Sequence, residues 1–169
     1  MIMEPIKKNI HTISFLVANK PGVLVRIAQV FARRGYNIDS LVVCASFDPN
    51  YSRMTITAQG DPQTLEQIIK QSAKLVDVLH VGEHTGSGAV EREYALLKVK
   101  ATPSTKATIL KFCKKFQTHV VDTTGHYLII SQGGTTEELD AFEALIKKYG
   151  ILEMIRSGKL VMAKGQTTT

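Results

Sequence analysis

The turn at residues 19–24, with the sequence NKPGVL, has residue types that suit binding of a small anion. An apolar, strand-like run precedes it, and apolar residues with helical spacing follow it, so the turn leads into a helix. Gly22 has no Cβ and lets a ligand approach the backbone. The first N–H groups of a helix lack internal partners and lie at the positive end of its dipole, so they can bind the carboxylate of a free amino acid. On this motif alone, a tight turn that merely starts a helix is the simpler interpretation.

A second turn at residues 101–105, with the sequence ATPST, occupies the same place in a later repeat of the pattern. Thr102 or Ser104 can cap the helix that follows, but the turn contains no glycine. The difference favours a ligand site in the first repeat alone.

Three residues near the end of the first repeat have a spacing that could be mistaken for a metal site. His80 and His84 lie four residues apart and flank Glu83. A zinc site of this spacing needs one helical face, whereas Gly82 and the strand-like run before it argue against a helix. We therefore predict no metal site.

The other reactive side chains form no catalytic constellation. Cys44 and Cys113 each lie in an apolar run, where a buried and unreactive thiol is usual. Glu91 and Glu93 share one face of a probable strand and are typical of solvated charges. Glycine-rich phosphate loops are absent from the sequence. The chain is thus predicted to have no catalytic residues and no cofactor of its own.

The composition is that of a globular protein. Of the 169 residues, 44% are hydrophobic and 21% are charged, enough for one good core or two small ones of roughly 75 residues. The net charge of +6 would suit a nucleic acid or a membrane, but the lysines are spread along the chain. No run of about 18 apolar residues is present, and we expect a soluble, cytoplasmic chain that binds no membrane.

Hydrophobic periodicity and turn residues predict two units with the same order of elements. The order in each is βαββαβ, which makes an α+β chain of two tandem ferredoxin-like units over residues 9–84 and 89–165. In the first unit the pattern predicts strands at His11–Ala18, Ile38–Phe47, Ser52–Ala58 and Leu75–Val81. It also predicts a helix at Val23–Gly35 and a second helix capped by Asp61–Pro62. In the second it predicts strands at Tyr94–Lys100, His119–Val121, Tyr127–Ser131 and Ile151–Ile155, a helix through Phe116 and another with a capping box of Thr135 and Glu138.

The same element order occurs in RNA-recognition modules, and the chain is basic. Those modules stack bases on aromatic side chains of the central strands. Here the first unit carries SRMTITAQ in that place, and the second offers only Tyr127. We therefore predict no nucleic-acid binding.

The run FLVANKPGVLVRIAQVFARRGYNIDSL resembles the amino-acid-binding ACT domain. Within the ACT superfamily, it is similar to the regulatory subunits of acetohydroxyacid (acetolactate) synthase. Five further segments, SRMTI, KLVDVLHVGE, VERE, LDAF and RSGKLVMAKG, are similar to the same family at corresponding positions. The resemblance extends from about Asn9 to Gly165. It implies that the first unit is an ACT domain.

The resemblance also implies a function in branched-chain amino-acid biosynthesis. Such a chain is no enzyme by itself; it activates a large catalytic subunit, which carries thiamine diphosphate, Mg²⁺ and FAD, and confers feedback inhibition by a branched-chain amino acid, usually valine. The effector lies between the ACT domains of a homodimer. Its matching residues here are Asn19, Gly22, Val23 and Leu24, with Asn37 and Ile38 from the facing subunit. An alternative that an ACT domain leaves open is a free-standing amino-acid sensor that controls another enzyme.

Overall fold

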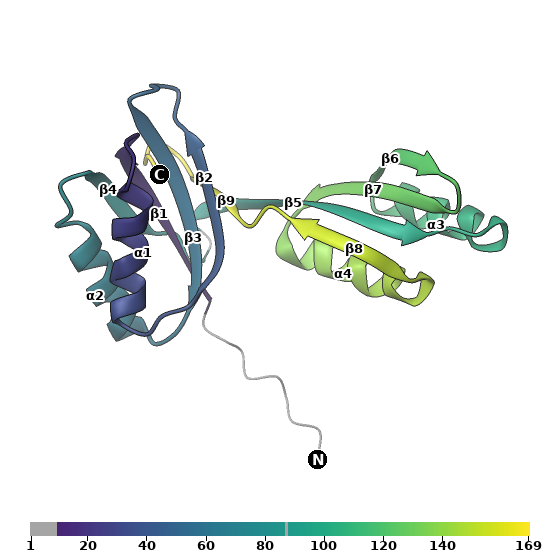
Figure 1. The fold of residues 1–169 in the computed structure, drawn as a ribbon, viewed down its shortest axis with the longest axis horizontal. Coiled ribbons are helices and arrows are strands. Elements are labelled where there is room, and N and C mark those ends of the chain that lie inside the picture. The colour runs from purple at the N-terminus through teal and green to yellow at the C-terminus, as the bar shows by residue number, and fades with distance from the viewer. Residues whose placement is uncertain (1–9, 87) are drawn as a thin grey trace, which may run out of the picture. The chain divides into compact units, whose positions relative to one another are not determined.

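The computed structural model describes residues 10–86 and 88–169. The first unit is an antiparallel sheet with two helices on one face (Figure 1). Its strand order is β2-β3-β1-β4, so β2 and β4 form the two edges. The predicted βαββαβ order is confirmed, with β1 (Ile10–Ala18), α1 (Val23–Arg33), β2 (Ile38–Ala45), β3 (Tyr51–Gln59), α2 (Pro62–Ser72) and β4 (Val78–Glu83).

Alternating strand residues and one stripe of each helix fill the core of this unit. On α1 the buried residues recur every four positions, which places them on the face toward the sheet. The antiparallel register of β1 and β3 puts Ile13 opposite Ile56 and Phe15 opposite Met54. The buried members are Ile13, Phe15, Val17, Val23, Ile27, Phe31, Met54, Ile56, Ala58, Leu65 and Ile68.

The second unit repeats this order, as predicted. Its path of four strands is β6-β7-β5-β8, and β9 (Leu160–Ala163) pairs with β5. The capping box of Thr135 and Glu138 at the start of its second helix is confirmed, with both reciprocal bonds present. The elements are β5 (Ala89–Lys100), α3 (Pro103–Lys115), β6 (His119–Thr124), β7 (Tyr127–Gly134), α4 (Thr136–Ile146), a 3₁₀ turn at Lys147–Tyr149 and β8 (Ile151–Arg156).

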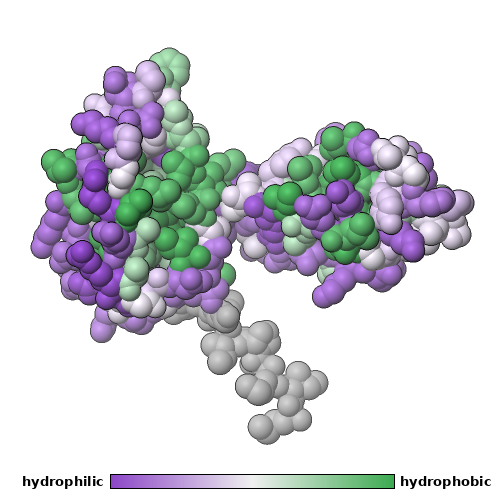
Figure 2. All heavy atoms as spheres, viewed as in Figure 1, coloured by the Kyte–Doolittle hydropathy of each residue, from purple (hydrophilic) through white to green (hydrophobic). Residues whose placement is uncertain are grey.

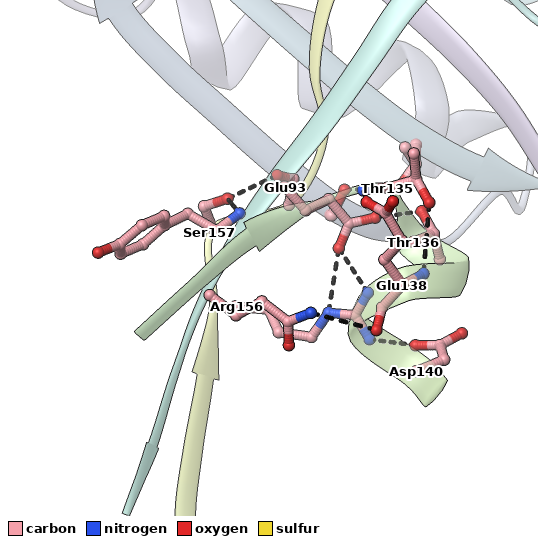
Figure 3. A network of polar contacts seen from close by, with 12 residues as sticks. Glu93, Thr135, Thr136, Glu138, Asp140, Arg156 and Ser157 are labelled. Carbon is pink, nitrogen blue, oxygen red and sulfur yellow. Dashed lines mark hydrogen bonds and ion pairs between the residues drawn. The ribbon is translucent and has the colours of Figure 1, made fainter. Parts of the chain in front are cut away.

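A buried ion pair connects β5, β8 and α4 in the second unit (Figure 3). Two nitrogens of Arg156, Nε and Nη2, donate to Glu93 Oε2 at 3.0 and 2.7 Å. Arg156 also donates to Asp140, and Thr136 donates to the other oxygen of Glu93. The side chain of Glu93 is only 7% exposed. These hydrogen bonds from Arg156 and Thr136 compensate for the burial of its charge.

Residue contacts divide the chain into a unit that runs to Val90 and also contains Lys159–Thr169, and a unit of Glu91–Gly158. The units predicted from sequence, residues 9–84 and 89–165, place Lys159–Gly165 in the second unit. Asn9, the first residue of the predicted ACT domain, lies outside the described residues. Every helix that the structure describes is too short or too polar to span a bilayer.

Candidate functional site

The glycine of the NKPGVL turn has a left-handed backbone, with φ 83° and ψ −9°, directly before α1. Residues with a Cβ adopt this conformation at a cost of roughly 1–2 kcal/mol, so the turn itself favours glycine. Gly22 is also exposed, together with the three residues before it. The backbone of the turn is thus open to approach.

Several N–H groups of this turn lack strong partners. The first regular helical bond of α1 runs from Arg26 N–H to Gly22 O at 3.1 Å. Val23 N–H makes one long bond, 3.5 Å, to Lys20 O. No side chain of residues 10–86 and 88–169 caps the helix, and Gly22 and Leu24 donate to no backbone carbonyl of that part of the chain. These groups can donate to an anion.

Asn19 borders the turn and is held by the loop between β2 and β3. Its backbone N–H donates to Asn50 O at 2.8 Å, and its Nδ2 donates to Pro49 O at 3.0 Å. The amide nitrogen is therefore used, and Oδ1 can accept from an ammonium group. N–H groups that can donate to a carboxylate and an oxygen that can accept from an ammonium group thus lie at one end of the first unit.

Of the six predicted site residues, the structure brings Asn19, Gly22, Val23 and Leu24 together. Asn37 and Ile38 lie beyond the far end of α1, whose 11 residues span roughly 16 Å. Within one chain they cannot share a ligand the size of an amino acid with the turn.

The start of α3 in the second unit differs from that of α1. Thr105 Oγ1 accepts from Thr102 N–H at 3.0 Å, and Thr105 N–H donates to Thr102 O at 3.0 Å. Pro103, the next residue, has no N–H to offer. Local side chains and proline thus occupy the positions that are open at α1.

Arg26 and Asp77 form an ion pair beside the glycine turn, which sequence reasoning missed. Arg26 Nη2 donates to Asp77 Oδ2. A Cβ placed on Gly22 would lie 3.3 Å from Arg26 Nη1. Arg26 follows Gly22 by four residues, and side chains of a helix point toward its N-terminus, which could have indicated this approach.

Comparisons with known proteins agree over nearly the whole chain. A model of the "AHAS small subunit-like ACT domain" matches residues 13–80, and a model of the "Small subunit of acetolactate synthase" matches residues 92–165. The chain is 43% identical over 155 residues to a probable acetolactate synthase small subunit of Archaeoglobus fulgidus, covering 92% of this chain and 97% of the relative. This chain belongs to the acetolactate synthase small-subunit family.

Further members of the small-subunit family show the same extent of similarity. One from Methanothermobacter thermautotrophicus is 41% identical over 98% of both chains. The crystal structure of the small subunit from Thermotoga maritima superposes with a TM-score of 0.85 at 37% identity, covering 94% of this chain and 99% of that one. The predicted family and fold are confirmed. All six predicted site residues, with Arg26 and Asp77, lie inside the segment that the ACT-domain model matches.

The two histidines and the glutamate near the end of the first unit lie on or just after β4, and His84 and Glu83 contact polar side chains of β1. His84 Nε2 lies 2.6 Å from Ser14 Oγ, and Glu83 accepts from His11 at 2.8 Å and from Thr85 at 2.7 Å. Burial, and then the charge of His80, lower the pKa of His84. Burial alone would raise the pKa of Glu83, but the bonds from His11 and Thr85 outweigh it and hold that pKa below its usual value.

The expected burial of both cysteines is half correct. Cys113 is buried in the second core, where burial raises the pKa of its thiol. Cys44 is exposed, and its predicted burial is wrong because Cys44 lies opposite Arg53 on the edge strand β2, whereas the core residue Met54 lies opposite its neighbour Val43 and so on the other face.

The surface of the first unit is apolar along this edge. Leu41 and Val43 of β2 are 37% and 44% exposed. Figure 2 shows hydrophobic residues gathered over the β2 side of the unit. An apolar edge strand with unpaired backbone groups favours pairing with another strand.

Proposed function

We propose that this chain activates the catalytic subunit of acetolactate synthase and makes it sensitive to feedback by a branched-chain amino acid, with valine as the first candidate. The chain contributes no catalytic residue. The reaction takes place on the larger partner, in the cytoplasm, with thiamine diphosphate, Mg²⁺ and FAD held there. Membership of the small-subunit family supports this assignment.

The observation that carries the proposal is the uncapped, exposed start of α1 at Gly22. The N–H groups of Gly22, Val23 and Leu24 take the effector's carboxylate, and Asn19 Oδ1 accepts from its ammonium group. Exposed Leu24, at 39%, supplies apolar surface for a branched side chain. The site thus contacts all three parts of the amino acid.

The effector site is completed by a second copy of the chain, paired along the β2 edge. β2 runs parallel to β1, because both are antiparallel to β3, and so β2 ends at the same end of the sheet as the Gly22 turn. Antiparallel pairing of two β2 strands therefore brings the start of the partner's strand to that end. Asn37 directly precedes β2 and Ile38 is its first residue, which supports their assignment to the facing subunit.

Regulation follows from the difference in effector affinity between two arrangements of the complex. The subunit stabilises an active arrangement of the catalytic subunit when the effector is absent, and the effector favours a less active one. A coupling free energy of about 1–3 kcal/mol suffices for a marked change in activity.

The test is reconstitution with the cognate catalytic subunit. Acetolactate formation is measured for the catalytic subunit alone, with this chain, and with this chain plus valine, leucine or isoleucine. The proposal predicts higher turnover on addition of the chain and inhibition by at least one of the three amino acids. Unchanged turnover on addition of the chain would contradict it and would favour a free-standing sensor.

A further inference from the structure

Arg26 lies where its positive charge faces the glycine turn. It is the fourth residue of α1, and side chains of a helix point back toward its N-terminus. Its Nη1 lies 3.3 Å from the point that a Cβ on Gly22 would occupy. A Cβ there would be in tight contact with the guanidinium, which lies beside the open N–H groups.

The ion pair with Asp77 uses only part of the guanidinium. Arginine has five N–H donors in a planar fork, and the bond to Asp77 Oδ2 comes from Nη2. Nη1, on the side of Gly22, therefore keeps donors for a second carboxylate. The Arg26 side chain is 44% exposed, so solvent and a small ligand can reach it.

Asp77 holds the arginine in this place. Its side chain is 13% exposed, and its backbone carbonyl accepts from Ala18 N–H at 2.8 Å, which fixes the segment before β4 against the end of β1. An arginine between two carboxylates is a common arrangement, because the fork matches carboxylate geometry. The same arrangement is present around Arg156, which binds both Glu93 and Asp140 in the second unit.

We infer that Arg26 binds the carboxylate of the amino-acid effector, with Asp77 as its fixed counter-ion. The inference rests on the proposed effector site at Gly22 and adds to it a charged side chain. It predicts that the carboxylate is bound more strongly than by backbone N–H groups alone, since bonds to a charged donor are shorter and stronger. It also makes the site specific for ligands with a free carboxylate.

A purely structural role of the Arg26–Asp77 pair makes a different prediction, and two ligands separate the roles. Valine and valinamide differ only in that an amide replaces the carboxylate. If Arg26 binds the carboxylate, Arg26→Gln weakens valine binding about tenfold, equivalent to about 1.4 kcal/mol, and leaves valinamide binding nearly unchanged. If the pair only shapes the turn, both ligands lose affinity by the same factor.

The experiment measures both ligands on the full chain by calorimetry and by ligand-observed NMR, which follows weak binding. Arg33→Gln, at the other end of α1, is the matched control and should change neither affinity. A loss confined to valine supports the inference. Equal losses for the two ligands, or valine binding at the wild-type affinity, overturn it. If the wild-type chain binds none of valine, leucine and isoleucine, the proposed function itself fails, which is a separate result.

Discussion

The guanidinium of Arg26 reaches back along α1 to Gly22, so that a Cβ on the glycine would lie 3.3 Å from Arg26 Nη1. Gly22→Ala therefore adds a methyl group to the proposed site at a left-handed position. We expect a loss of about 1 kcal/mol of unfolding free energy and weaker valine binding. Urea denaturation and calorimetry measure the two effects.

Gly125→Ala, in the turn between β6 and β7 of the second unit, is the control for backbone strain. Gly125 has φ 58°, and nothing lies within 4 Å of its would-be Cβ. The alanine variant should lose a similar amount of unfolding free energy and bind valine with the wild-type affinity. Equal valine affinities of the two variants would show that the Gly22 turn is not the site.

The apolar β2 edge gives a prediction about assembly. Val43→Lys places a charge in the proposed dimer interface, where it would be buried without a partner. We expect a monomeric first unit and loss of valine binding, measured by light scattering and calorimetry. Val76→Lys changes a residue that is 94% exposed and lies outside every strand, and it should leave the dimer intact. A dimer that survives Val43→Lys argues against pairing through β2.

The buried pair of Glu93 and Arg156 predicts a stability difference in the second unit. Glu93→Gln leaves the half-buried guanidinium with only Asp140, and we expect a loss of about 2 kcal/mol. Glu153→Gln removes the exposed partner of Lys98 and should cost less than about 1 kcal/mol. Denaturant melts of the two variants compare these values; equal losses would mean that burial of Glu93 has no energetic consequence.

His84 predicts a pH dependence of stability. Its folded pKa lies below the ordinary value of 6.5, because burial and His80 disfavour its charged form. The unfolded chain then binds more protons than the folded chain. The contribution of neutral His84 to the free energy of unfolding is therefore complete above pH 6.5 and is lost as the pH drops from there toward the folded pKa. We expect His84→Gln to flatten this part of the profile of unfolding free energy against pH. A profile unchanged by the substitution would show that groups other than His84 cause the pH dependence.

Local patterns were sufficient to predict the fold. Four-residue apolar spacing in α1, the Asp61 cap of α2 and the Thr135–Glu138 box are all properties of short segments, and the structure confirms each. The apolar neighbours of Leu75 predict a strand there, but Leu75 N–H donates to Ser72 O and Val78 N–H donates to Leu75 O in a turn, so β4 begins only at Val78. Boundaries depend on such hydrogen bonds, which residue types do not determine.

The parts of the candidate site that escaped prediction depend on contacts distant in sequence. Arg26 and Asp77 lie 51 residues apart, and only the fold brings them together. Exposure of Cys44 likewise follows from its place opposite Arg53 on the edge strand β2. The Gly22 turn could be found from sequence because its glycine and the helix start are adjacent along the chain.

The most direct test of the account compares Gly22→Asp with Gly125→Asp after reconstitution with the catalytic subunit. Both substitutions place aspartate at a left-handed glycine, but only the first brings a carboxylate to the open N–H groups and Arg26. There it occupies the donors and repels the effector's carboxylate, which should weaken valine binding by a few kcal/mol, or about a hundredfold. The measurement is acetolactate formation across a valine series, with thermal melts to show that each variant is folded. The account predicts that the Gly22 variant still activates but resists valine, while the Gly125 variant is inhibited like the wild type. A folded Gly22→Asp chain that valine inhibits as it inhibits the wild type would contradict it.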